Sequence, residues 1–263
     1  MRIHALTTGR VRVKHAFLHA STGVRRQVDL FLPGPWSDPL PIHCWAVEHD
    51  GRLLLVDTGE LASARDIPFA RFEVGPQDEL PRALAAAGLA VDDVDRVVLT
   101  HLHGDHMHGA VHVPRPVLVH DRELTFSGKI STRVLARAFH QPVPAELDVQ
   151  PLRLDAGRFG GFECSAPITG DGRIVAVATP GHTPGHLSVV CIDDEGRHVL
   201  LAGDLTDTLE QLHDRRPDAV GVPRLARATF EAVFAHAREH PTVYLPSHDP
   251  ESAARLAAGT VLA

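Results

Sequence analysis

The sequence predicts an α/β fold in which two β-sheets carry helices on their outer faces, giving four layers. Short apolar runs that end in turn residues recur in both halves of the chain, and stretches with helical spacing separate them. The 263 residues are 44% hydrophobic and 22% charged, which is enough apolar material for one large core. Because neither an internal repeat nor a linker divides the chain, we expect a single domain over residues 1–263. The spacing alone is compatible with other α/β architectures as well.

The first half of the chain predicts the order strand, strand, helix, strand. The strands are expected within residues 41–51, 52–60 and 95–103, and each run ends in polar residues. The Ala- and Leu-rich stretch 78–89 predicts a helix, for which Gly88 is a plausible stop. Polar side chains are therefore delivered at the carboxyl ends of strands, where functional sites gather.

The second half repeats this pattern and then ends in helices. Strands are expected within four apolar runs and a final one: residues 161–166, 172–182, 187–196, 197–204 and 242–249. The stretch 223–240 carries apolar side chains at helical spacing and predicts a long helix. A further helix is expected after the final strand. Its N-cap would be Asp249, its first-turn proline Pro250, and Glu251 would be an acid that the helix dipole favours.

Charge and composition restrict the class of partner. The 26 Lys and Arg against 33 Asp and Glu leave a net charge of −7, which argues against nucleic acid or an anionic membrane as the partner. A small-molecule substrate is expected instead, and the oligomeric state is left open, with a homodimer among the options. Apolar runs are far shorter than the about 18 residues of a membrane span, and the charged N-terminus lacks the apolar block of a secretory signal, so we predict a cytoplasmic protein.

The three cysteines are an odd number without any CxxC spacing. Cys44, Cys164 and Cys191 therefore suggest neither a disulfide framework nor a cysteine zinc site. We expect them to be buried thiols.

The stretch THLHGDHMHG carries the strongest chemical signal. It follows an apolar strand and places His101, His103, Asp105 and His106 within six residues. Alternate residues of an extended segment point the same way, so His101 and His103 can reach one ion, while Asp105 and His106, beyond the turn at Gly104, reach a second. The spacing favours a site with two metal ions.

Three further metal-competent residues follow later apolar runs. They are His182 in TPGHTPGH, Asp204 in LLAGD and His248 in LPSHD. Each alone is as readily a helix cap or an ordinary polar contact, but together with the HxHxDH stretch they indicate one site. A carboxylate has two oxygens, so Asp204 can bridge two cations at the roughly 3.5 to 4 Å separation of two-metal hydrolytic sites.

These motifs resemble the metallo-β-lactamase fold superfamily of hydrolases, and the resemblance spans nearly the whole chain. It implies a four-layer αββα sandwich of two mixed sheets flanked by helices. It also implies two metal sites bridged by Asp204, one held by His101, His103 and His182 and the other by Asp105, His106 and His248. Zinc is the default pair of ions, although iron, manganese and cobalt also accept mixed nitrogen and oxygen ligands.

Residues near these motifs are assigned supporting roles by the same resemblance. Asp57 in LLLVDTG is expected to orient a metal-ligand loop, with a simple Asp-Thr-Gly turn as the alternative. His186 matches a supporting position, and His108 and His112 match no ligand position, so these three are left off the metals.

The expected chemistry is hydrolysis. Two divalent cations lower the pKa of a bridging water from about 15.7 towards about 7, which yields a hydroxide that attacks a carbonyl. The catalytic residues are then Asp204, which holds the ions, and Asp105, which can protonate the leaving group. No GxSxG, HExxH, GxxxxGK[ST] or GxGxxG motif supports another kind of catalysis.

Within the superfamily, the sequence looks most like the N-acyl homoserine lactonase branch, whose members open lactone rings in quorum-sensing signals. One departure is that this branch commonly has a tyrosine just after the bridging aspartate, whereas Leu205, Thr206 and Asp207 follow Asp204 here. The only tyrosine, Tyr244, lies in an apolar strand and is expected in the core.

Other functions stay open at this point. They are a glyoxalase II-like thioesterase, a mono-iron thiol or persulfide dioxygenase of the same fold, and a binding protein without activity. Residues 67–72 and 129–139 supply apolar material either for an acyl or aryl pocket or for ordinary packing.

Overall fold

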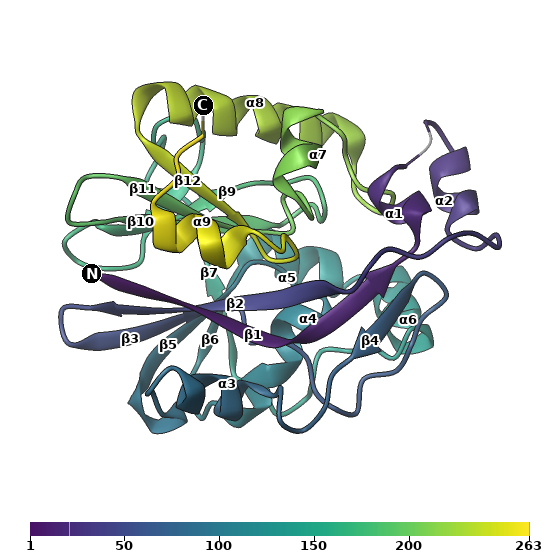
Figure 1. Cartoon of the computed structure of the whole chain (residues 1–263), viewed down its shortest axis with the longest axis horizontal. Helices are drawn as coiled ribbons and strands as arrows, with labels where there is room; N and C mark the ends of the chain where they lie inside the picture. The colour runs from purple at the N-terminus through teal and green to yellow at the C-terminus, as the bar shows by residue number, and fades with distance from the viewer. Residues whose placement is uncertain (21, 263) are drawn as a thin grey trace.

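Two mixed β-sheets pack face to face, with helices on their outer faces, in the computed structural model of the chain, which describes residues 1–20 and 22–262 (Figure 1). The first sheet has the order β4-β1-β2-β3-β5-β6-β7. Its strands are β1 (Arg2–Val13), β2 (Leu40–His49), β3 (Arg52–Val56), β4 (Ala70–Glu73), β5 (Val94–Leu99), β6 (Val117–His120) and β7 (Val149–Leu152). The pairs from β3 to β7 are parallel and the others antiparallel.

The second sheet has the order β12-β11-β10-β9-β8. Its strands are β8 (Ser165–Pro167), β9 (Ile174–Ala178), β10 (Leu187–Ile192), β11 (His198–Gly203) and β12 (Thr242–Pro246). Only the pair β11 and β12 is parallel. The predicted four-layer αββα class is confirmed.

The main core lies between the two sheets. In β3, Leu54 and Val56 face this core, while Leu53 and Leu55 face the helical layer on the other side of the sheet. Because both faces of β3 are buried, its sequence is a continuous apolar run rather than an alternating one. The second sheet covers the same core from the other side with Val189, Leu201 and Leu245, among others.

Two helices cover the outer faces of the two sheets, at the top and the bottom of Figure 1. Helix α8 (Pro223–Glu239) packs Phe230 and Val233 on the second sheet, and α3 (Leu80–Ala86) packs Leu80 and Leu84 on the first. Both helices were predicted. The chain leaves α3 through Gly88, whose φ of +77° is in the left-handed region that glycine tolerates.

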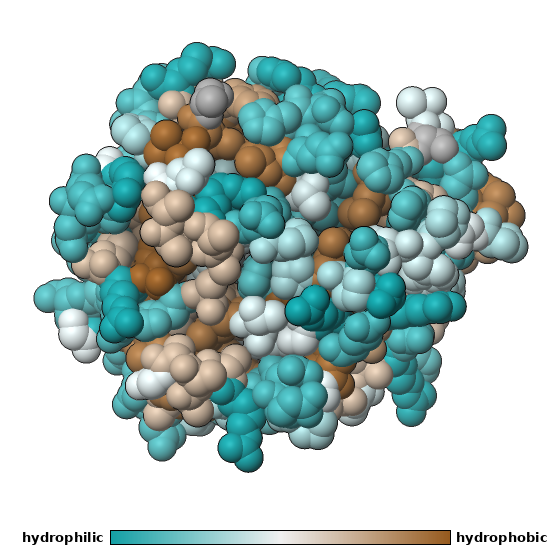
Figure 2. Space-filling view, in the orientation of Figure 1, coloured by the Kyte–Doolittle hydropathy of each residue, from teal (hydrophilic) through white to brown (hydrophobic). Residues whose placement is uncertain are grey.

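The remaining helices are short. They are α1 (His15–Leu18), α2 (Arg25–Asp29), η1 (Val91–Asp93), α4 (Gly104–Met107), η2 (His108–His112), α5 (Asp121–Ser127), α6 (Ile130–Ala138), α7 (Leu209–His213) and α9 (Ser252–Ala258). Helices α1 and α2 form a projection at one end of the molecule, where Figure 2 shows brown, apolar side chains at the surface. Val24 and Phe31 are 76% and 57% exposed there. Within the described ranges, no helix is long and apolar enough to cross a membrane.

The sequence-based expectations missed or misplaced several elements. Strand β1, the longest in the chain, was not predicted, because its polar residues alternate without a clear apolar period and its pairing with β2 and β4 decides its structure. Helix α9 begins at Ser252 with Glu251 at its N-cap position, so the assignment of Asp249 as the N-cap was wrong. Asp249 lies before the helix, and its carboxylate accepts hydrogen bonds from Leu209 N, Glu251 N and Arg255.

Two of the three cysteines and the tyrosine are buried as expected, whereas the expectation of a buried thiol was wrong for Cys164. Cys44 and Cys191 are buried free thiols, and Cys164 is half-buried and also free. Tyr244 is fully buried, and its hydroxyl pairs with that of Thr206 at 2.8 Å.

Candidate metal centre

The seven predicted ligand residues come from the carboxyl ends of four strands and meet at one edge of the two sheets. β5 leads to His101 and His103 and on to α4, which carries Asp105 and His106. His182, Asp204 and His248 follow β9, β11 and β12. Parallel pairing places the ends of β11 and β12 side by side, so residues 44 positions apart in the chain become neighbours.

One group consists of three imidazoles and one carboxylate oxygen. His103 Nδ1 lies 3.0 Å from His101 Nε2 and 2.8 Å from His182 Nε2. Asp204 Oδ2 lies 3.5 Å from His182 Nε2 and 3.9 Å from His101 Nε2. All four ligand atoms lie within 4.8 Å of one another, which is close enough to hold one ion.

A second group lies on the other side of Asp204. Asp105 oxygens approach His106 Nε2 at 3.9 Å and His248 Nε2 at 3.5 Å. Asp204 Oδ1 lies 3.1 Å from His106 Nε2 and 3.3 Å from His248 Nε2. The two oxygens of Asp204 therefore face different groups, as a bridging carboxylate requires.

The backbone fixes this orientation of Asp204. Gly203 has a φ of +59°, and an added Cβ would lie 2.8 Å from His186 Nε2 and from Thr100 Oγ1, so a larger residue does not fit. The Asp204 N–H donates to His186 Nε2 at 3.1 Å. His186 therefore supports the site without facing either group of ligand atoms.

The donor atoms fit divalent cations. His106 Nε2 and Asp204 Oδ1 are buried and have no hydrogen-bond partner among the described residues, although they lie 3.1 Å apart. Two buried polar atoms without a hydrogen-bond partner at one point are costly unless an ion binds them. Imidazole nitrogens and carboxylate oxygens are also the ligands that first-row divalent metals accept.

Carboxylates raise the pKa of three imidazoles of the centre, whereas burial and neighbouring rings lower the pKa of His101 and His103. Burial lowers the pKa of each ring, and with the neighbouring histidines it brings that of His103 to about 4. For His182 the Asp218 carboxylate outweighs burial and raises the pKa to about 9, and for His248 the Asp204 carboxylate does the same, also to about 9. The Asp204 and Asp57 carboxylates likewise raise the pKa of His106 well above its usual value, despite burial. The centre attracts positive charge, which divalent cations supply.

Outer hydrogen bonds orient the imidazoles. Asp57 Oδ2 lies 2.9 Å from His106 Nδ1, and the same carboxylate accepts from Thr100 N at 2.8 Å, so Asp57 joins the ligand loop as expected. Asp218 Oδ2 lies 2.8 Å from His182 Nδ1. These contacts direct each Nε2 towards the site.

Sequence reasoning missed two buried acids beside the centre. Asp218 lies in a loop without a periodic pattern, and only the general need of a ligating histidine for a partner pointed to such a residue. Glu123 accepts hydrogen bonds from Leu102 N, Thr183 Oγ1 and Gly185 N, and so joins the loops that carry His103 and His182. Neither acid has a sequence motif of its own.

Two histidines of the motif region lie outside the centre, as expected. His108 Nδ1 pairs with Glu60 at 2.6 Å, and His112 Nε2 pairs with Glu79 at 3.0 Å. Neither is among the groups whose ligand atoms gather at a common point.

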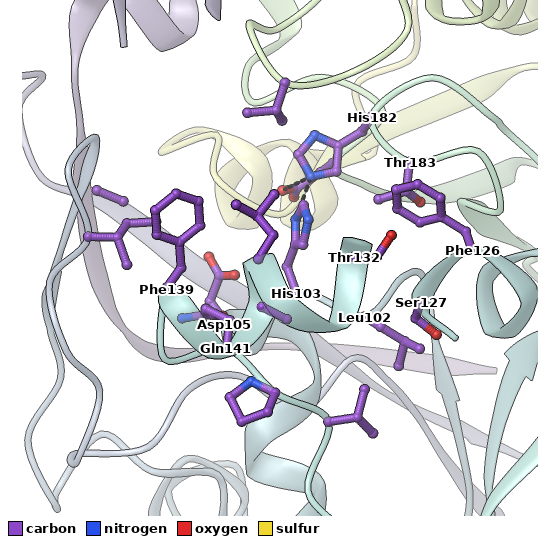
Figure 3. Close-up of a pocket in the computed structure, with 18 of the residues that line it drawn as sticks. Leu102, His103, Asp105, Phe126, Ser127, Thr132, Phe139, Gln141, His182 and Thr183 are labelled. Carbon is purple, nitrogen blue, oxygen red and sulfur yellow. Dashed lines mark hydrogen bonds and ion pairs between the residues drawn. The ribbon is translucent and has the colours of Figure 1, made fainter. Parts of the chain in front are cut away.

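A cavity of about 990 Å³ opens onto the centre. Its polar end is formed by His103, Asp105, His182, Asp204, Asp207 and His248. Figure 3 shows His103 and His182 converging on one side, with Phe139 and Phe126 on either side of the space. Residues from both 67–72 and 129–139 line the cavity, as one of the two readings of these segments predicted.

Residues 37–248 match the family model described as the metallo-beta-lactamase superfamily. The chain belongs to this superfamily. Among its curated relatives is the N-acyl homoserine lactonase AiiA of Bacillus thuringiensis subsp. kurstaki, 24% identical over 95% of this chain and 94% of that protein. An N-acyl homoserine lactonase of Bacillus cereus is 25% identical over 81% of this chain and 82% of that protein.

Solved structures show the same fold. An N-acyl homoserine lactone hydrolase with N-hexanoyl-L-homoserine at its catalytic metal centre superposes with a TM-score of 0.76 at 20% identity, over 95% of this chain and 93% of that one. The dizinc quorum-quenching lactonase AidC gives 0.68 at 18% identity, over 94% and 87%. The comparisons confirm the predicted family, its lactonase-like branch and the class of metal-dependent hydrolase.

Proposed function

We propose that this chain is a dinuclear metal-dependent lactonase that opens the ring of an N-acyl homoserine lactone. The observation that carries the proposal is the placement of Asp204, whose two oxygens face two separate groups of ligand atoms. The relatives named as lactonases match along nearly the whole chain, which supports the substrate class.

The two ions would be held by the seven residues of the centre. One ion would be held by His101, His103 and His182, and the other by Asp105, His106 and His248, with Asp204 placed to reach both. We propose zinc for both, since three imidazoles in one site suit that ion. Two bound cations would supply a water whose pKa is lowered towards neutrality, and positive charge for the carbonyl oxygen of the ester.

The chain's own residues carry the proton to the leaving group and orient the imidazoles. Asp105 lines the cavity and also approaches His248, so its carboxyl group lies between the centre and a bound substrate. From this position it is placed to carry a proton to the ring oxygen that leaves when the lactone opens. The buried partners Asp57 and Asp218 keep the imidazoles in one tautomer during this step.

The cavity fits an amphipathic ester. Away from the centre its wall is apolar, and Phe69 contacts the rings of Phe17, Phe31 and Phe139 at centroid distances of 5.6 to 6.1 Å. An acyl chain would lie against these rings while the lactone lies at the polar end.

The polar end differs from the branch pattern in one respect. Tyr244 is buried against Thr206, and Asp207, three residues after Asp204, lines the cavity. Burial and the Asp204 charge raise the pKa of Asp207 to about 7. Asp207 thus supplies a polar side chain beside the substrate where a tyrosine is absent.

The test is a hydrolysis screen of lactones, esters and thioesters on protein reconstituted with zinc. We expect N-acyl homoserine lactones to be opened, and two ions per chain to be retained. Asp204→Ala should remove hydrolysis and reduce the metal content, whereas Asp214→Ala, which changes an exposed carboxylate, should do neither.

Three outcomes would contradict the proposal. Unchanged hydrolysis by Asp204→Ala would exclude the bridged centre. Cleavage of thioesters alone would indicate a glyoxalase II-like thioesterase. One iron per chain with oxygen uptake would indicate a thiol or persulfide dioxygenase instead.

A further inference from the structure

A third group of histidines lies outside the centre, at the opposite end of β11. His198 is the first residue of this strand, and His236 and His240 lie in the last turn of α8 and just after it. His236 and His240 are four residues apart, so they lie on the same face of α8 at its end. The His198 N–H donates to Pro241 O at 2.8 Å, which fixes the strand beside the helix end.

The ring separations resemble those of the metal centre. His198 Nδ1 lies 2.9 Å from His236 Nε2, against 2.8 and 3.0 Å for the two imidazole pairs around His103. Ring centroids in the third group are 4.2 to 4.9 Å apart, against 4.5 to 4.7 Å around His103. One ligand atom from each of the three residues lies within 4.8 Å of the others.

Two of the three rings are buried, and among the described residues no carboxylate forms an ion pair with any of them, although the charge of Asp193 acts on His198. His198 is 7% exposed and His236 is fully buried, with the Phe159 ring stacked on His198 at 5.8 Å. Two facing imidazole nitrogens share a single proton, so one lone pair is always directed at the other ring. An ion that binds both nitrogens uses both lone pairs, and without a carboxylate ligand the site suits zinc, copper or nickel rather than magnesium or calcium.

We propose that His198, His236 and His240 form a further metal site that binds one divalent transition-metal ion and joins the start of β11 to the end of α8. The His240 ring lies parallel to that of His198, at 4.2 Å and 6°, so it turns about its side-chain bonds to direct a nitrogen at the ion. His240 is half-buried, and no hydrogen bond from the described residues holds its ring. A fourth position towards solvent would be filled by water.

The site stabilises the fold and takes no part in hydrolysis. Six residues of β11 separate it from Asp204, a distance of about 20 Å at roughly 3.3 Å per residue. An ion that binds only the folded chain raises the free energy of unfolding and therefore the melting temperature. Metal binding here should change the melting temperature without changing the rate of the reaction.

The test compares metal-stripped wild type with His240→Ala and with His213→Ala, which removes an exposed histidine at the end of the short helix α7. Each protein is titrated with zinc alone, bound equivalents are measured by atomic emission, and melting temperatures are recorded with and without zinc. We expect wild type and His213→Ala to bind one equivalent more than His240→Ala. The loss of a ligand should weaken this site by more than about 100-fold, since the loss of an outer partner alone costs about 10- to 100-fold.

Equal zinc binding by all three proteins would overturn the proposal, as would equal zinc-induced shifts in melting temperature. Circular dichroism shows whether His240→Ala is folded. His198→Ala is a second variant, which should lose the same equivalent. The result is independent of the dinuclear centre, because Asp204→Ala lowers the zinc count at that centre whether or not the histidine site exists.

Discussion

Replacement of Asp57 by asparagine tests whether the outer hydrogen bonds set the metal affinity. Asn has the same shape and tolerates the φ of +60° found here, so the backbone is expected to keep its conformation. Its amide oxygen can still accept from Thr100 N. Its NH2 group then faces His106 Nδ1, which in the wild type donates to a carboxylate oxygen at 2.9 Å.

The change acts on the tautomer of His106. With a donor opposite it, Nδ1 has to accept, so the ring proton moves to Nε2, the atom that faces Asp204 and would hold an ion. We expect zinc at the second site to be bound about 10- to 100-fold more weakly, or roughly 1.4 to 2.7 kcal/mol. The first site, whose imidazole His182 depends on Asp218, should keep its affinity.

The assay is a competition titration of metal-stripped protein with zinc and a chelating indicator. Asp95→Asn is the matched control, because Asp95 also accepts a backbone hydrogen bond, from Leu53 N at 2.8 Å, but lies far from the ligands on the opposite end of β5. The reasoning would be refuted if Asp57→Asn bound zinc at both sites with affinities within about threefold of the wild-type values.

Three further predictions concern stability. Phe230→Ala, in the layer between α8 and the second sheet, should lower the free energy of unfolding by about 3 to 5 kcal/mol, as measured by urea denaturation. Gly109→Ala should lower the melting temperature by several degrees, because the new methyl group would overlap the Thr58 carbonyl oxygen; Gly170→Ala, with open space around its Cα, is the control. Burial lowers the pKa of His43 to about 4, so the folded chain keeps it neutral while the unfolded chain takes up a proton below about 6.5. Stability is then complete above pH 6.5 and falls towards pH 4, and His43→Gln should flatten that dependence by roughly 1 kcal/mol per pH unit.

The sequence predicts secondary-structure elements and candidate ligand residues best where the signal is local. The strand before His101, the helix α8 and the four residues of the HxHxDH stretch are all short-range patterns, because a strand end and its loop are set by neighbouring residues. Which distant residues complete the site follows from the family resemblance, since no periodicity relates His182, Asp204 and His248 to one another.

What escaped prediction depends on tertiary pairing. Strand β1 has an irregular apolar pattern and a register shift between Thr7 and Arg10, so its place in the sheet is set by β2 and β4. Asp218 and Glu123 lie in a loop and a short helix, and their importance comes from the side chains and backbone groups that they meet across the fold. A one-dimensional pattern has no means of marking such contacts.

Charge balance explains why so many ionisable groups share a buried site. Four carboxylates touch the imidazole cluster, namely Asp57, Asp105, Asp204 and Asp218, and together they carry a charge of −4 when ionised. Two divalent cations would carry +4 and so would balance these four carboxylates when the imidazoles are neutral. A single divalent cation would leave an excess of −2, which is costly at low dielectric. The same carboxylates outweigh burial and raise the pKa of His182 and His248 to about 9, so protons also respond to this excess of negative charge. The outer carboxylates would thus favour two ions over one, and they also orient the rings.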